Sequence, residues 1–133
     1  MPFCVTVMSH NNIQNNRYKR VMVSLTNQQY SNYRVIFLDD NSDDGNLEGT
    51  RRVMEELGFP RDRIVYVANK ERKFATYNIV HAAHSYCKEE EIQLLLDGDD
   101  ELIGQQVLSM YNAIYQSNSD VWLAYSSYIS NFF

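Results

Sequence analysis

Three carboxylates lie within four positions at the end of one apolar run. The segment "IQLLLDGDDELI" (92–103) contains Asp97, Asp99 and Asp100, and Gly98 would let the chain turn so that Asp97 and Asp99 point the same way. Carboxylates this close repel one another, and a shared divalent cation removes the repulsion. Oxygen-only ligands suit Mg²⁺ or Mn²⁺, which usually leave room for phosphate oxygens. We therefore expect a Mn²⁺ or Mg²⁺ site here, with a solvated turn that caps the next helix as the alternative.

A second acidic segment, "RVIFLDDNSDDG" (34–45), raises the same question earlier in the chain. Asp39 and Asp40 directly follow the apolar residues "VIFL", and Ser42 can serve the turn. We expect one carboxylate of the pair to point into a cleft, where it can accept a hydrogen bond from a base N–H, and the other to point towards the flanking loop. The alternative is an ordinary loop in which residues 43–45 start a helix.

The elements that must position these side chains follow from hydrophobic periodicity. Runs rich in β-formers occupy 3–8, 33–38, 63–68, 92–96 and 121–128. The runs are nearly continuous rather than alternating, which is typical of parallel strands covered on both faces.

Apolar stripes at helical spacing separate these runs. They fall at 18–25, 47–57, 79–87 and 107–115, and Gly58 and Pro60 mark the end of the second. The resulting order, β-α-β-α-β-α-β-α-β, predicts a single α/β domain over residues 1–133, built as a sandwich with right-handed crossovers.

Ligands of open α/β sheets bind outside the carboxyl ends of the strands. Four polar clusters fall at such ends in this chain, at 9–12, 39–45, 69–73 and 97–101. Because all four would meet on one edge of the sheet, the sequence predicts a binding site there.

The composition excludes several classes of function. The net charge of −5 and the pI of about 5.1 argue against a general nucleic-acid or membrane-surface binder, although Lys70, Arg72 and Lys73 form a local basic patch. No signal peptide is visible, and no segment approaches the roughly 20 apolar residues of a membrane span. We expect a protein of the cytoplasm or of the cytoplasmic face of a membrane.

The chain has two cysteines, Cys4 and Cys87, each in an apolar context and neither in a CxxC pair. A structural zinc site is not expected. We predict two buried free thiols in a reducing compartment.

A receiver-like signalling domain is an alternative, because five βα units fit this length. Such a site needs a basic residue from the last strand's end, and no Lys, Arg or His follows Lys88. The acidic pair also follows the second strand-like run rather than the first. Both points disfavour this alternative.

The whole pattern resembles the large inverting glycosyltransferase family called family 2, with the GT-A fold. The opening "VTVMSHNN" is similar to its first strand and turn, with His10 in place of the usual tyrosine. The segment 17–45 is similar to its first helix and second strand, "FATYNIVHAA" to its third helix, and "LLLDGDDEL" to its DxD-type metal motif. Outside that motif, the matching residues are Gln28, Tyr30, Asp40, Ser42 and Asn78.

The resemblance implies a three-layer α/β/α sandwich that binds a nucleotide sugar, with a UDP-sugar favoured. Asp40 would hydrogen-bond the base, and Arg72 or Lys73 would pair with the diphosphate. The residues expected at the nucleotide are Ser9, His10, Asn11, Asp39, Asp40, Ser42, Arg72, Lys73, Asn78, Asp97 and Gly98. Those expected at the metal are Asp97, Asp99 and Asp100.

The chain departs from the family in its second half. Inverting enzymes need a general base to activate the acceptor hydroxyl, and no acidic residue follows Asp120. We expect this chain to be the donor-binding part of the enzyme, without most of the acceptor-binding half. The acceptor is unknown, and its binding site would come from a missing C-terminal half or from a protein partner. The end "YISNFF" (128–133) would be a broken strand or an interface. The alternative is a catalytically inactive GT-A-like module for binding or assembly.

Overall fold

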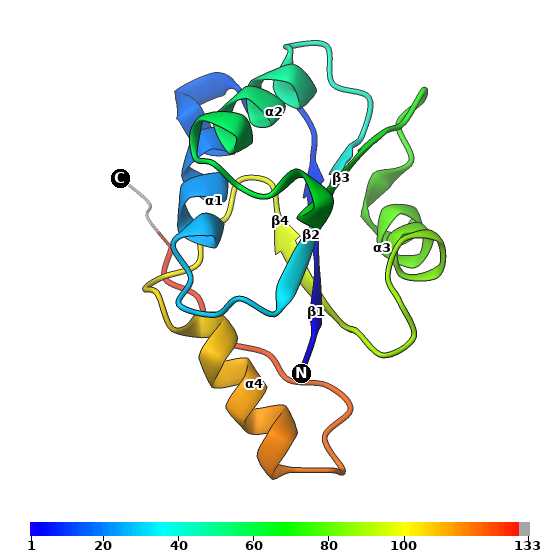
Figure 1. Cartoon of the computed structure of the whole chain (residues 1–133). Coiled ribbons are helices and arrows are strands. Elements are labelled where there is room, and N and C mark those ends of the chain that lie inside the picture. The colour runs from blue at the N-terminus through cyan, green and yellow to red at the C-terminus, as the bar shows by residue number, and fades with distance from the viewer. Residues whose placement is uncertain (131–133) are drawn as a thin grey trace.

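A four-stranded parallel sheet forms the centre of the protein. The computed structural model describes residues 1–130. The strands are β1 (Phe3–Ser9), β2 (Tyr33–Asp39), β3 (Ile64–Ala68) and β4 (Ile92–Asp97). They stand in the order β3-β2-β1-β4, and each neighbouring pair is parallel (Figure 1). The predicted α/β fold with a parallel sheet is confirmed.

Four α-helices and two short 3₁₀ helices connect or follow the strands. They are η1 (Gln14–Asn16), α1 (Arg17–Thr26), α2 (Asn46–Glu56), η2 (Arg61–Arg63), α3 (Phe74–Ser85) and α4 (Val107–Ser117). Within residues 1–130, none of these helices is both long and apolar enough to cross a membrane.

Helices cover both faces of the sheet and make three layers. Helices α1 and α2 pack together on one face, and α3 lies on the other (Figure 1). Side chains alternate along β1, since Phe3, Val5 and Val7 join the core cluster that includes α1 and α2. Cys4 points the other way and joins the smaller cluster under α3. This alternation is the period of two that a β-strand imposes on its side chains.

The last helix, α4, packs near the start of the chain. Leu108 is fully buried in the main core cluster, together with Phe3. The backbone N–H of Leu108 donates to Gln28 Oε1 at 3.2 Å, and the Met1 ammonium donates to Asn112 Oδ1 at 2.6 Å. These contacts hold α4 at the amino ends of the strands, away from the acidic edge.

The predicted fifth strand is wrong. Residues 121–128 have no regular secondary structure, and Trp122 and Tyr125 are 95% and 89% exposed. Strand propensity is realised only when a neighbouring strand and a packed face are present, and this segment has neither among residues 1–130. Residues 131–133 of the predicted broken strand or interface lie outside the described part of the chain.

Two of the predicted apolar stripes also differ from the structure. Val80 is 51% exposed, and the buried positions of α3 are Asn78 and Ala82. Leu57 is 43% exposed because α2 ends one residue before it. The face of α3 that meets the sheet is therefore partly polar, which an apolar count does not detect.

The free-thiol prediction is wrong as well, because Cys4 and Cys87 form a disulfide. Their Cα atoms lie 5.7 Å apart although 83 positions separate them in sequence. Cys4 lies on the α3 side of β1, and Cys87 follows the end of α3. The crossover through α3 brings the two together, and the bond ties the end of this helix to the sheet.

Candidate functional site

The carboxyl ends of the four strands meet at one edge of the sheet. Ser9 of β1 pairs with Asp39 of β2, Asp39 pairs with Ala68 of β3, and Met8 pairs with Asp97 of β4. This register brings the two acidic segments to opposite sides of Ser9. The predicted convergence at one edge is therefore present.

Asp39 turns towards its own loop and the start of α2. Its Oδ2 accepts the Ser42 N–H at 3.0 Å, and its Oδ1 accepts the Ser42 hydroxyl at 2.6 Å and the Asn46 amide at 2.8 Å. Only 5% of Asp39 is exposed. This carboxylate therefore fixes the loop that follows β2.

Asp40 turns the opposite way and caps α3. Its Oδ1 accepts the Lys73 N–H and the Asn69 amide, each at 2.8 Å, and its Oδ2 accepts the Phe74 N–H at 2.9 Å. Desolvation alone would raise the pKa of Asp40, but these hydrogen bonds, together with one from Asn78, lower it below its ordinary value. An ionised carboxylate is also favoured at the positive end of a helix.

Four asparagines complete the network, and all but Asn69 are buried. The Asn46 amide nitrogen donates to Ser9 Oγ at 2.9 Å as well as to Asp39, and Asn12 donates to the same hydroxyl at 2.8 Å. The Asn69 amide bridges Asp40 and Asn78, with 2.8 Å to each. Asn46 Oδ1 has no hydrogen-bond partner within residues 1–130, so the amide is held through its nitrogen.

Of these amides, the sequence predicted only Asn78. Asn12, Asn46 and Asn69 were not assigned to the site, although Asn12 and Asn69 lie in the polar clusters 9–12 and 69–73 and Asn46 begins α2. Their position was the available signal.

The turn after β1 is joined to the turn after β2. His10 Nδ1 lies 2.8 Å from the Asp40 carbonyl oxygen, so this ring nitrogen carries the proton and donates it. The Asn11 N–H donates to Ser42 Oγ at 2.9 Å, and Asn11 Oδ1 accepts the Asp43 N–H at 3.0 Å. The predicted residues His10, Asn11 and Ser42 are thus brought together with Asp40.

Gly98 is needed for a reason other than the one expected. Its backbone N–H donates to the Met8 carbonyl at 2.7 Å. A Cβ at this position would lie 2.5 Å from Ser9 Oγ and 2.8 Å from the Met8 carbonyl oxygen. Close approach of β4 to β1, rather than a left-handed turn, therefore requires glycine here.

The three aspartates after β4 are close enough to interact. Partial desolvation raises the pKa of Asp97, and the negative charges of Asp100 and Asp99 raise it further. An oxygen-only donor set whose members repel one another fits a hard divalent cation. Within residues 1–130, however, the ligand oxygens of all three do not lie within 4.8 Å of one another. Among the His, Cys, Asp and Glu residues that the structure describes, only Cys4, Cys87 and Glu91 meet that distance, and both sulfurs are used in the disulfide.

The basic patch lies beside the cap of α3. The Arg72 guanidinium lies 4.8 Å from the centre of the Phe74 ring, and the Lys73 ammonium pairs with Glu71. Phe74 has a φ of +65° and its side chain is 63% exposed. This backbone conformation is strained by about 1–3 kcal/mol for a residue with a side chain.

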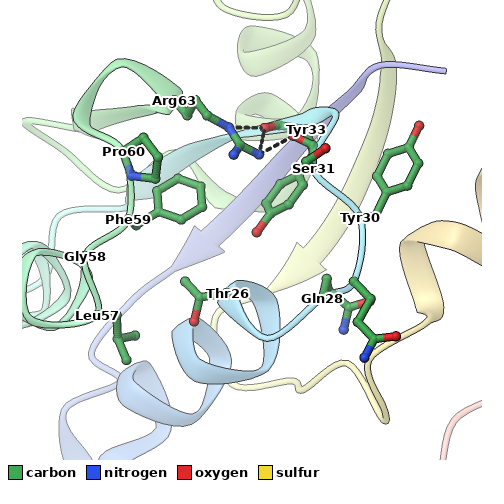
Figure 2. A pocket seen from close by; sticks show the side chains of 11 residues that line it. Thr26, Gln28, Tyr30, Ser31, Tyr33, Leu57, Gly58, Phe59, Pro60 and Arg63 are labelled. Carbon is green, nitrogen blue, oxygen red and sulfur yellow. Dashed lines mark hydrogen bonds between the residues drawn. The ribbon is translucent and has the colours of Figure 1, made fainter.

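A pocket lies at the other end of the sheet, away from these residues. Figure 2 shows this pocket of about 550 Å³, in which the Arg63 guanidinium lies over the Tyr33 and Phe59 rings and bonds the Tyr33 carbonyl. Tyr33 begins β2, so the pocket lies at the amino ends of the strands. It contains no predicted site residue.

A family model confirms the resemblance read from the motifs. The model described as glycosyl transferase family 2 matches residues 4–132. The chain belongs to this family. Membership removes the case for a receiver-like domain. No curated protein sequence matches the chain significantly.

Solved structures show that this family 2 domain has the GT-A fold. Staphylococcus aureus TarS aligns with a TM-score of 0.69 at 20% identity, over 88% of this chain and 20% of TarS. Its 1–349 fragment, in complex with UDP-GlcNAc, gives the same score and identity over 32% of the fragment. The Pyrobaculum calidifontis mannosyltransferase PcManGT, in complex with GDP-Man and Mn²⁺, has a TM-score of 0.69 at 21% identity, over 80% of this chain and 30% of PcManGT. The chain spans a fifth to a third of the length of these structures.

Proposed function

We propose that the chain is the donor-binding part of a metal-dependent glycosyltransferase that transfers a sugar from a nucleotide sugar, with a UDP-sugar favoured, to an unknown acceptor. One observation carries the proposal. The acidic pair Asp39 and Asp40 and the acidic triplet that begins at Asp97 stand at the same edge of the sheet, on the two strands that flank β1. A nucleoside diphosphate and its cation need such neighbouring acceptors for the base and for the metal.

The base would lie at Asp40. This carboxylate is ionised, and the small part of it that is exposed, 5% of the residue, is where it could accept a base N–H. His10 and Asn11 would line the base and ribose beside it. The other residues assigned to the nucleotide are Ser9, Asp39, Ser42, Arg72, Lys73, Asn78, Asp97 and Gly98.

The buried members of this set act through the loops they hold. Ser9, Asp39 and Asn78 are each at most 5% exposed, and their side chains bond to neighbouring residues of the edge, so they position it. Asp40 is also only 5% exposed, so the small accessible part of its carboxylate would meet the base. Arg72 and Lys73 would meet the diphosphate by charge, after Lys73 exchanges its pairing with Glu71.

Asp97, Asp99 and Asp100 would hold Mn²⁺ or Mg²⁺, which when bound neutralises the charge that develops on the leaving diphosphate. Partial desolvation and, after it, the negative charges of Asp100 and Asp99 raise the pKa of Asp97, and a bound cation would relieve that repulsion, which supports this assignment. Asp99 and Asp100 are exposed and free to turn towards a cation. The complex of PcManGT with GDP-Man and Mn²⁺ is consistent with a divalent ion in this family.

We assign no general base within residues 1–130, because the aspartates of the proposed site are already assigned to the loops, the nucleotide base or the cation, and no acidic residue follows Asp120. The base that activates the acceptor would come from another part of the protein or from a partner. A binding or assembly module without turnover is the second candidate, and the same observation favours it.

Calorimetric titration with UDP, with and without MnCl₂, tests the proposal. We expect Mn²⁺-dependent binding, and Asp99→Asn should weaken it at least about ten-fold, or 1.4 kcal/mol. Asp120→Asn, an exposed carboxylate beyond α4, is the matched control and should leave the affinity unchanged. The proposal would be refuted if UDP did not bind, or if its affinity changed neither with MnCl₂ nor with Asp99→Asn. Release of sugar from UDP-sugars would separate the enzyme from the module without turnover.

A further inference from the structure

Phe74 is a large aromatic residue in an unfavourable place. It begins α3 with a φ of +65°, a region that residues with side chains rarely adopt. Its ring is 63% exposed and belongs to neither buried core cluster. A glycine would adopt this backbone conformation without strain and would lose no core packing. Core packing within residues 1–130 therefore does not explain the presence of the ring.

The strained backbone is held by the residue assigned to the base. Asp40 accepts the N–H groups of both Lys73 and Phe74, and the Asn69 amide anchors the same carboxylate. A group that bonds to the small exposed part of the Asp40 carboxylate is thereby brought next to the residue that carries the ring.

The Arg72 side chain contacts the Phe74 ring and helps to hold it in place. The Arg72 guanidinium lies 4.8 Å from the ring centre, a cation–π distance. Despite this contact most of the ring surface remains open to solvent. An aromatic ring in this arrangement offers its remaining surface for stacking.

We propose that Phe74, backed by Arg72, stacks against the base of the bound nucleotide and so helps to hold its N–H edge at Asp40. The inference rests on the proposed nucleotide site and adds a residue that the sequence motifs did not indicate. Stacking accepts any base, because every base has a π-face. Phe74 would therefore add affinity for the base, whereas the hydrogen bond at Asp40 would select which base binds.

The test separates the base from the diphosphate. Calorimetry with MnCl₂ would compare UDP with inorganic pyrophosphate, which has no base, for the wild type, Phe74→Gly and Phe74→Tyr. We expect Phe74→Gly to bind UDP about ten-fold more weakly, within the range for loss of one stacked base. Its affinity for pyrophosphate should be unchanged, and Phe74→Tyr should bind UDP as the wild type does.

A control variant removes a remote exposed ring. Tyr125 is 89% exposed and lies outside the site, so Tyr125→Ala should leave both affinities unchanged. Thermal melting of Phe74→Gly should show a fold at least as stable as the wild type, because the strain at φ +65° is relieved. Weaker binding of this variant then cannot be attributed to unfolding.

The outcomes distinguish this inference from the proposed function. If the wild type binds UDP and Phe74→Gly binds it equally well, the stacking role is wrong while the nucleotide site stands. Equal losses for UDP and pyrophosphate would also overturn it, since the ring would then act on the diphosphate or on the fold. A wild type that binds neither ligand would refute the nucleotide site and the stacking role together.

Discussion

The hydroxyl of Ser9 lies in the space where a side chain at Gly98 would begin. A Cβ on residue 98 would stand 2.5 Å from Ser9 Oγ and 2.6 Å from Ser9 Cβ. The same hydroxyl accepts the amides of Asn12 and Asn46, so it cannot move without breaking the network that holds Asp39. The acidic end of β4 can thus lie close to β1 only because residue 98 has no side chain.

Gly98→Ala should therefore destabilise the fold by about 1–3 kcal/mol, the usual cost of overpacking a close contact. Urea unfolding would measure the change. Gly49→Ala is the matched comparison, because a Cβ there meets side chains and no backbone, with Ile13 Cδ1 at 2.8 Å and Tyr18 Cε2 at 3.2 Å, and its cost should be smaller. Equal effects of the two substitutions would show that Ser9 and β4 adjust freely, contrary to this prediction.

Asn46 offers a second test of the same network. Its amide nitrogen lies 2.8 Å from Asp39 Oδ1 and the residue is fully buried. Asn46→Asp would place a second carboxylate against Asp39 and replace a donor with an acceptor. We expect a loss of about 3–5 kcal/mol at neutral pH, as for an uncompensated buried charge.

The Asn46→Asp penalty should shrink in acid, where protonation of one carboxyl restores a donor. Unfolding curves at two pH values would show this. Asn15→Asp, at an exposed position beside α1, should change stability by no more than about 0.5 kcal/mol. A variant at residue 46 that is as stable as the Asn15 variant would mean that the Asp39 network does not hold the loop.

The sequence could predict which loops meet at the edge of the sheet, because a parallel sheet with helical crossovers allows few arrangements of its strands. Once four apolar runs alternate with helices, right-handed crossovers bring their carboxyl ends together, and residues 9, 39, 68 and 97 must be near one another. Whether Asp39 or Asp40 turns towards α3 depends on where that helix begins, which the apolar pattern did not define. Asn46 and Asn69 were missed for a related reason, since a single amide that bonds within the edge leaves no periodic signal.

Other errors came from interactions that are distant in sequence. Cys4 and Cys87 are 83 positions apart, and only the packing of α3 shows that they meet. The run 121–128 has strand propensity, yet a strand forms only beside a partner. The local hydrophobic pattern therefore predicted a strand correctly where a neighbouring strand is present to pair with it, as for β1. It failed at residues 121–128, which have no such neighbour among residues 1–130.

The lowered pKa of Asp40 predicts a specific pH dependence. Because the folded carboxyl has a pKa below its ordinary value near 3.8, its ionised form stabilises the folded state. This contribution is fully present above the unfolded pKa and is lost as the pH falls through the folded pKa. Asp40→Asn should cost about 1–3 kcal/mol at neutral pH, where charge-assisted bonds to α3 are lost.

The stability difference between wild type and Asp40→Asn should then narrow below about pH 4. Urea unfolding from pH 3 to pH 7 would measure it. Asp62→Asn is a suitable control, since Asp62 is exposed. The difference in stability between the wild type and Asp62→Asn should be small at every pH. If the stability difference between the wild type and Asp40→Asn widened as the pH falls, Asp40 would not be an ionised helix cap.

The disulfide should contribute strongly to stability because it closes a long loop. With 83 positions between Cys4 and Cys87, the chain-entropy estimate is about 4–5 kcal/mol. Reduction should lower the midpoint of urea unfolding, and the double variant Cys4→Ala, Cys87→Ala should be destabilised with or without reductant. The sheet itself should persist, since the main core cluster does not include either cysteine. Two thiols titratable in the denatured, unreduced protein would show that the bond is not formed.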